Sequence, residues 1–139
     1  MITVLLADDH AMVRDGLRHI LEAAGDIHIV GLASNGEEAV AQATAGCPDI
    51  AVIDISMPGM DGIEATRQIM RSCPHTRVLT LSMYHTGEYV QRAVKAGARG
   101  YVLKDAAGSE LVKAVRSLHD GKRYFSPQVA GDDNMKDSQ

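Results

Sequence analysis

Residues 4–9 have the sequence VLLADD, a short apolar run that ends in two carboxylates. Two further runs follow the same pattern: residues 51–53 (AVI) precede Asp54, and residues 101–103 (YVL) precede Lys104. Short apolar runs that are separated by helical patterns are typical of buried parallel strands. The sequence therefore predicts a parallel sheet in which each of these strands ends at a charged side chain.

Strands and helices alternate outward from these runs along the whole chain. The expected strands lie near residues 2–7, 27–33, 50–53, 78–81 and 100–103. The expected helices lie near residues 12–24, 36–45, 63–72, 86–96 and 107–119, and glycine or proline follows most of them. Regular alternation with right-handed crossovers predicts a doubly wound α/β fold. We expect a flavodoxin-like three-layer sandwich with a five-stranded parallel sheet in the order 2-1-3-4-5.

The composition fits one globular domain and excludes several functions. The chain has 139 residues, of which 45% are hydrophobic and 23% charged, and its net charge of −4 gives no basis for direct nucleic-acid binding. No apolar run reaches the roughly 18 residues of a membrane span. The first residues have no signal-peptide pattern, so we expect a cytoplasmic protein without a membrane segment.

Neither the two cysteines nor any common catalytic or nucleotide-binding motif indicates a function for this chain. Cys47 and Cys73 are each followed by proline and lack metal-ligand spacing, so we expect two free thiols in a reducing cytoplasm. The chain has no GxxxxGK[ST] or GxGxxG loop, no HxxxH pair and no GxSxG elbow.

The charged strand ends suggest a phosphoryl-transfer site. In an open α/β sheet, ligands bind outside the carboxyl ends of the strands, where Asp8, Asp9, Asp54 and Lys104 would gather. Three facing carboxylates must hold either protons or a cation, and Mg²⁺ prefers oxygen ligands. The backbone carbonyl of Ser56 is a further candidate ligand. Asp54 is the best candidate nucleophile, because a carboxylate can form an acyl phosphate.

Two more residues could act at the same edge of the sheet. Ser82 ends the expected fourth strand, and its hydroxyl could contact a phosphoryl oxygen together with Lys104. Tyr101 lies within the fifth strand, where chemistry alone favours an ordinary half-buried tyrosine.

Four segments resemble the receiver domain of bacterial two-component response regulators: LLADDHAMVRDGL, DIAVIDISMPGMDGIEA, VLTLS and KAGARGYVLKD. The resemblance covers about residues 2–120. It implies that Asp54 accepts a phosphoryl group from a sensor histidine kinase. It also implies that Mg²⁺ is held directly by Asp9, Asp54 and the Ser56 carbonyl, and by Asp8 largely through water. Such a domain catalyses only its own phosphorylation and dephosphorylation, so we do not expect an enzyme.

The same resemblance assigns roles to the remaining candidates. Ser82 and Tyr101 match the switch pair, in which the hydroxyl moves toward the phosphate and the ring turns inward, and Lys104 matches the lysine that pairs with the phosphate. The sequence departs from the common pattern at Asp105, where many receivers have proline after the lysine, and at Met83, which follows Ser82 and precedes Tyr84. Met83 replaces a small residue and could narrow access to the site, and the ring of Tyr84 could shield the acyl phosphate from water.

Further segments resemble the NarL/FixJ group, namely ADDHAMVRDGL, GYVLKDA and SLHDGKRYFSP. Members of that group carry a C-terminal LuxR-type DNA-binding domain, so the resemblance implies a transcriptional output and a homodimer that could form on phosphorylation. We expect a receiver domain over residues 1–122 and a linker or disordered tail over residues 123–139, with the DNA-binding domain absent from this chain.

Two alternatives stay open. The chain could be a stand-alone receiver that docks onto other proteins when it is phosphorylated. A phosphatase of the haloacid-dehalogenase type is disfavoured, because that family has an Asp-x-Asp motif at the end of its first strand. Here Asp8 and Asp9 are adjacent, and Ser56 stands where the second acid would follow Asp54.

Overall fold

The structure, a computed structural model, describes residues 1–130. Its centre is a parallel sheet of six strands in the order β2-β1-β3-β4-β5-β6. The strands are β1 (Ile2–Ala7), β2 (Ile27–Ala33), β3 (Ile50–Asp54), β4 (Arg77–Ser82), β5 (Ala98–Leu103) and β6 (Tyr124–Phe125). The predicted order of the first five strands is confirmed, and β6 adds a short sixth strand beside β5.

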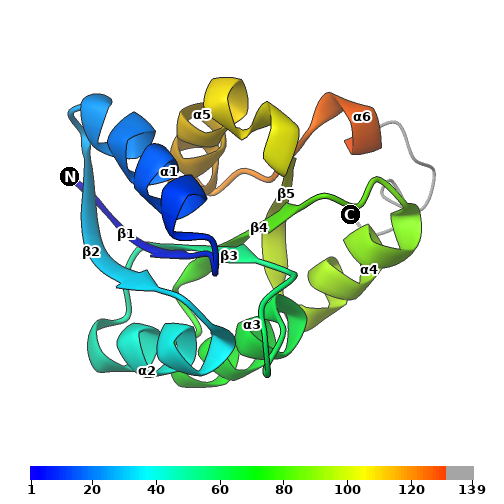
Figure 1. The fold of residues 1–139 in the computed structure, drawn as a ribbon, viewed down its shortest axis with the longest axis horizontal. Coiled ribbons are helices and arrows are strands. Elements are labelled where there is room, and N and C mark those ends of the chain that lie inside the picture. Colours follow the sequence, from blue (N-terminus) through cyan, green and yellow to red (C-terminus); the bar gives the residue numbers. More distant parts are fainter. Residues whose placement is uncertain (131–139) are drawn as a thin grey trace.

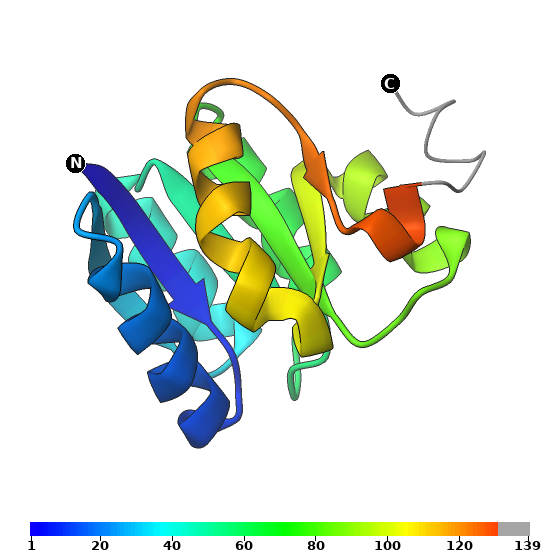
Figure 2. The ribbon, with the colours of Figure 1, turned by 90° about the horizontal axis from the view of Figure 1, so that it is seen from above.

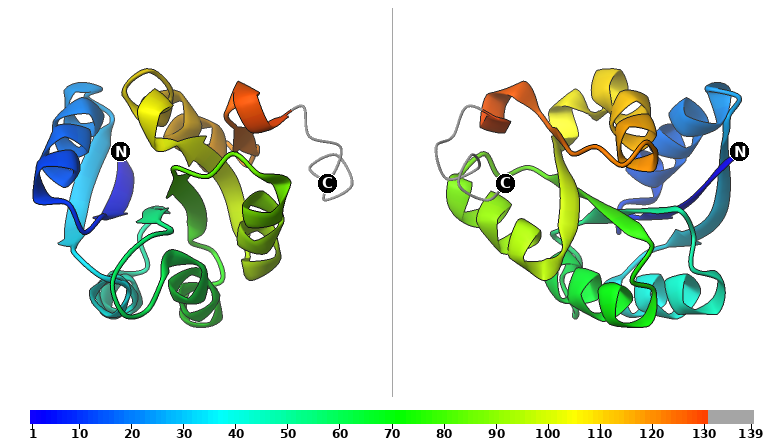
Figure 3. Two further views of the ribbon diagram at one scale, coloured as in Figure 1. Left: turned by 45° about the vertical axis from the view of Figure 1, so that its right-hand side comes forward. Right: turned by 180° about the vertical axis from the view of Figure 1, so that it is seen from behind.

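Helices cover both faces of this sheet. They are α1 (Ala11–Ala23), α2 (Gly36–Gly46), α3 (Gly62–Ser72), α4 (Gly87–Ala96), α5 (Ala107–His119) and α6 (Pro127–Ala130), with a 3-10 turn, η1 (Lys104–Ala106), before α5. Helices α1 and α5 lie on one face, and α2, α3 and α4 lie on the other (Figures 1 and 3). The predicted three-layer sandwich is therefore confirmed.

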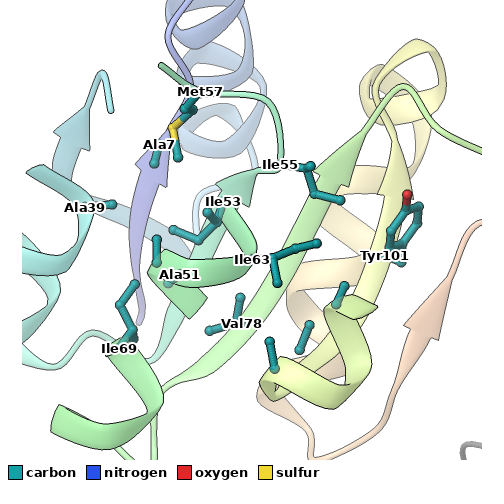
Figure 4. Packing of buried hydrophobic residues seen from close by; sticks show 14 of the residues in the cluster. Ala7, Ala39, Ala51, Ile53, Ile55, Met57, Ile63, Ile69, Val78 and Tyr101 are labelled. Atoms are coloured by element: carbon teal, nitrogen blue, oxygen red, sulfur yellow. The ribbon is translucent and has the colours of Figure 1, made fainter. Parts of the chain in front are cut away.

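The inner strands of the sheet are largely apolar because both of their faces are buried, as in β3, where every residue is buried. Successive residues of a strand point to opposite faces. In β1, Val4 and Leu6 belong to the core under α1 and α5, while Leu5 and Ala7 belong to the core under α2, α3 and α4. Figure 4 shows the second of these cores, with Tyr101 of β5 among its members. This double coverage explains why the sequence shows continuous apolar runs and little alternation.

The connection from β3 to α3 is tight and places Asp54 against a helix. Asp61 caps α3, since its Oδ1 accepts a hydrogen bond from the Glu64 amide at 2.9 Å. A Cβ atom on Gly62, the first residue of α3, would collide with the carbonyl oxygen of Asp54. Glycine at this position therefore allows α3 to start directly against the end of β3.

The prediction of two free thiols is wrong, because Cys47 and Cys73 form a disulfide with a Cα–Cα distance of 5.5 Å. Each cysteine follows the last residue of a helix, Cys47 after α2 and Cys73 after α3. These helices pack side by side because the strands that they connect are close in the sheet. Their last turns consequently meet, although 26 positions separate the cysteines in the sequence.

The folded unit extends beyond the predicted boundary at residue 122. Residues 124–130 form β6 and α6, and Ser126 and Val129 are buried. The polar composition of the last residues concealed the apolar contacts that Phe125 and Val129 make with the core. The rest of the predicted tail, residues 131–139, lies outside the described residues. Among residues 1–130, no helix is both long and apolar enough to cross a membrane.

Candidate functional site

Acidic side chains meet where β1 and β3 end. Asp8 directly follows β1, Asp54 is the last residue of β3, and the two strands are paired neighbours. Asp8, Asp9, His10 and Asp54 each offer a ligand atom, and these atoms lie within 4.8 Å of one another. The structure thus brings together the three carboxylates that the sequence singled out. Asp8 and Asp54 are almost completely buried, with 0% and 1% of their surface exposed.

Lys104 lies between two of these carboxylates. Its Nζ atom donates a hydrogen bond to Asp54 Oδ2 at 2.9 Å and lies 3.1 Å from Asp8 Oδ2. It follows β5 as the first residue of η1, so the end of this strand determines its position. Because three carboxylates face one ammonium group, the site keeps an excess of negative charge.

Burial and charge act on these groups in opposite directions. Burial raises the pKa of Asp54; the Lys104 hydrogen bond and charge oppose this rise, and the charge of Asp8 adds to it. Burial lowers the pKa of Lys104, but the hydrogen bonds and charges of Asp54 and Asp8 outweigh burial and raise it overall. Lys104 therefore stays cationic at neutral pH, beside a carboxylate that is costly to keep ionised.

The oxygens of this cluster suit a hard divalent cation. Apart from ion-pair contacts with Lys104 Nζ at 3.1 Å and with His10 Nδ1 at 3.2 Å, the buried oxygens Asp8 Oδ2 and Asp9 Oδ1 have no partner among the described residues. Carboxylate oxygens are ligands that Mg²⁺ prefers. The Ser56 amide donates a hydrogen bond to Asp54 Oδ1 at 3.2 Å, and the use of the Ser56 carbonyl as a ligand stays a prediction.

His10 is a member of this cluster that the sequence reasoning missed. Its Nδ1 atom lies 3.2 Å from Asp9 Oδ1, and its amide donates to Asp8 Oδ1 at 2.9 Å. Its side chain is exposed. The signal was available, because His10 directly follows the two aspartates in the sequence.

Ser82 and Tyr101 are both connected to the backbone of Tyr84. The Tyr84 amide donates to Ser82 Oγ at 2.9 Å, and the Tyr101 hydroxyl donates to the Tyr84 carbonyl at 2.8 Å. Tyr101 is completely buried, and burial raises its pKa to about 12. The hydroxyl therefore keeps its proton, and its hydrogen bond holds the segment between β4 and α4 against β5.

Met83 and Tyr84, the two residues that follow Ser82, lie at the surface beside the site. Met83 is exposed and lines, together with His10 and Lys104, a cavity of about 500 Å³. The Tyr84 ring stacks on Tyr89 of α4, with 4.1 Å between ring centroids. The proposed effects of Met83 on access and of Tyr84 on phosphate lifetime stay predictions.

The chain is similar to known proteins over most of its length. Residues 4–116 match the response regulator receiver domain family. The chain belongs to this family. The receiver domain is 43% identical over 130 residues to response regulator UvrY from Escherichia coli K12, covering 94% of this chain and 60% of UvrY. It is 39% identical over 130 residues to response regulator GacA from Pseudomonas aeruginosa, covering 94% of this chain and 61% of GacA. The chain thus spans about 60% of the length of these curated relatives.

Solved structures agree with the fold of this receiver domain. A LuxR-family response regulator from Aurantimonas sp. SI85-9A1 superposes with a TM-score of 0.91 and 34% identity, covering 99% of this chain and 96% of that one. The receiver domain of NarL from Mycobacterium tuberculosis superposes with a TM-score of 0.82 and 37% identity, covering 87% and 98%. The predicted similarity to receiver domains of the NarL/FixJ group is therefore confirmed.

Proposed function

We propose that this receiver domain accepts a phosphoryl group on Asp54 and relays this event to an output. The observation that carries the proposal is the position of the Asp54 carboxylate. It is buried at the end of β3, bonded through Oδ2 to Lys104, and close to the carboxylates of Asp8 and Asp9. A histidine kinase is the proposed donor.

In the proposed transfer, an Asp54 oxygen attacks phosphorus while the bond from phosphorus to the donor nitrogen breaks. The leaving imidazole takes up a proton, and Asp54 becomes an acyl phosphate. Mg²⁺, held by Asp8, Asp9, Asp54 and the Ser56 carbonyl, would neutralise part of the phosphoryl charge. Lys104 then exchanges its bond to Asp54 Oδ2 for a bond to a phosphoryl oxygen, because the Lys104 ammonium group lies only 2.9 Å from Asp54 Oδ2.

Ser82 and Tyr101 are the proposed switch residues. The Ser82 oxygen accepts a hydrogen bond from the Tyr84 amide, so a movement of the Ser82 hydroxyl toward the phosphoryl group would either pull the Tyr84 backbone with it or break this bond. The same segment receives the hydrogen bond from Tyr101, so its movement changes the surface formed by α4 and β5.

The proposed output is a C-terminal LuxR-type DNA-binding domain in the full-length protein. This extension is supported by relatives of greater length and by the likeness to a LuxR-family regulator. Dimerisation on phosphorylation is part of this proposal. The alternative is a stand-alone receiver that acts by docking, and the coding sequence after Gln139 distinguishes the two.

The test is intact-mass spectrometry after incubation with acetyl phosphate, with and without Mg²⁺. We expect the wild type to gain one phosphoryl group only with Mg²⁺, and Asp54→Asn to gain none. Asp105→Asn is the matched control, because it removes an exposed carboxyl beside Lys104. Phosphorylation that persists in Asp54→Asn would refute the assignment.

A further inference from the structure

Ser126 is completely buried between β6 and α6 and connects three elements. Its amide donates to the Tyr101 carbonyl at 2.9 Å, and its hydroxyl oxygen accepts from the Leu103 amide at 3.0 Å. The same hydroxyl donates to Glu110 Oε1 of α5 at 2.7 Å. Ser126 thus binds β5 on both sides of Val102 and attaches it to α5.

Glu110 lies on the face of α5 that packs on the sheet, and only 9% of its surface is exposed, which is unusual for a glutamate. Its Oε1 atom accepts hydrogen bonds from Ser126 and, at 3.2 Å, from the Tyr124 hydroxyl. A buried carboxylate is costly without such donors. Both of these donors come from the segment 124–130, which we call the exit segment because it ends the described chain. Figure 2 shows it running beside β5, with which β6 pairs in parallel, and turning into α6.

These bonds end next to the residues that the proposed function uses. Tyr101 is the proposed switch tyrosine, and Leu103 directly precedes Lys104. Lys104 Nζ now lies 2.9 Å from Asp54 Oδ2, so a phosphoryl group on Asp54 would occupy the space between them. Lys104 would then move outward, and the nearest backbone that could follow it is the end of β5, where the Leu103 amide donates to Ser126 Oγ.

We infer that Ser126 and Glu110 form a latch, meaning the hydrogen bonds that hold the exit segment on β5 while Asp54 is unphosphorylated. Phosphorylation of Asp54 weakens this latch. Ser126 is then a positioning residue for Lys104 and Tyr101. This inference rests on the proposed function. It adds the route by which the state of Asp54 reaches the chain that follows residue 130.

Reciprocity gives a test that a purely structural role would not pass. If phosphorylation weakens the latch, removing the latch must favour the phosphorylated form by the same factor. A hydrogen bond to a charged group corresponds to a factor of about ten in an equilibrium constant. We therefore expect Ser126→Ala to bind beryllofluoride, a mimic of the phosphoryl group, about tenfold more tightly than the wild type.

The experiment measures beryllofluoride affinity by calorimetry and hydrogen exchange of residues 124–130, both on the 139-residue chain with Mg²⁺. In the wild type, beryllofluoride should speed exchange of the exit segment. In Ser126→Ala, exchange should be fast in both states. Ser126→Thr keeps the hydroxyl and should behave as the wild type. Glu110→Gln keeps the shape but weakens the acceptor, so it should change both readouts in the same direction as Ser126→Ala.

Ser109→Ala is the matched control, because it removes an exposed hydroxyl of α5 that donates to the Ala106 carbonyl. Faster exchange in Ser126→Ala with unchanged beryllofluoride affinity would overturn the latch, since Ser126 would then only stabilise the fold. Exchange of the wild-type exit segment that does not respond to bound beryllofluoride would also overturn it. A wild type that binds no beryllofluoride would instead refute the proposed function.

Discussion

Reduction of the disulfide between Cys47 and Cys73 should lower the free energy of unfolding and leave the phosphorylation site intact. The bond lies at the last turns of α2 and α3, whereas Asp54 lies at the carboxyl end of β3. The cysteines are 26 positions apart. For a loop of this size, the chain-entropy relation gives a stabilisation of about 3.5 kcal/mol, because the bond restricts the unfolded chain.

The folded state should tolerate the reduced thiols. Cys73 Sγ lies 3.3 Å from the Ala43 carbonyl oxygen, so a buried thiol at this position has an acceptor for its proton. The loss of stability should therefore come from the unfolded chain and not from rearrangement of α2 and α3. With a urea dependence of about 2 kcal/mol/M, the unfolding midpoint should fall by about 1.8 M.

The assay is urea unfolding followed by circular dichroism, with and without a thiol reductant, with free thiols counted by alkylation and mass spectrometry. The double variant Cys47→Ser, Cys73→Ser should unfold near the midpoint of the reduced wild type, and the reductant should not shift it further. A midpoint that moves by less than about 0.5 M after complete reduction would refute the entropic reasoning.

Four further predictions follow from the geometry. Gly62→Ala should cost about 1–3 kcal/mol in urea unfolding and slow phosphorylation, because its Cβ would displace the Asp54 carbonyl. Leu111→Ala should cost about 2–5 kcal/mol in the same assay, because the side chain of Leu111, a residue of α5, is completely buried in the core between α5 and the sheet. The raised pKa of Asp54 means that the folded chain holds a proton that the unfolded chain releases, so stability falls as pH rises from 3.8 to the raised pKa. Asp54→Asn should therefore have a higher free energy of unfolding than the wild type at pH 7. Equal free energies of unfolding at pH 7, or a difference that persists below pH 3.8, would contradict the raised pKa of Asp54 as the cause. Tyr84→Ala should shorten the lifetime of the acyl phosphate if the ring shields it, and equal lifetimes would exclude that role.

The sheet and the acidic cluster were predictable because they depend on local patterns. Five apolar runs predicted five strands, and the doubly wound topology places the ends of β1 and β3 together. Asp8 and Asp54 meet as a direct result. Lys104 was expected at the same edge, although its ion pairs with both carboxylates depend on side-chain positions that the sequence does not specify.

The features that were missed depend on contacts between distant parts of the chain. The disulfide joins the ends of two helices, and no spacing rule indicates that these ends meet. Strand β6 has two residues, too few to show a periodic pattern. A glutamate in a helical pattern is normally taken as solvent-exposed. Only the hydroxyls of Tyr124 and Ser126, placed beside it by the fold, explain why Glu110 is buried.

The sixth strand also affects the tendency of this domain to aggregate. Without β6, the outer side of β5 would present free amide and carbonyl groups, a template on which strands of other molecules can assemble. Pairing of Gly100 with Tyr124 and of Tyr101 with Phe125 shortens that exposed template. A fragment that ends at residue 122 would uncover it and should aggregate at concentrations where residues 1–130 remain monodisperse. By pairing with β5, strand β6 should reduce the addition of strands from other molecules to this edge of the sheet.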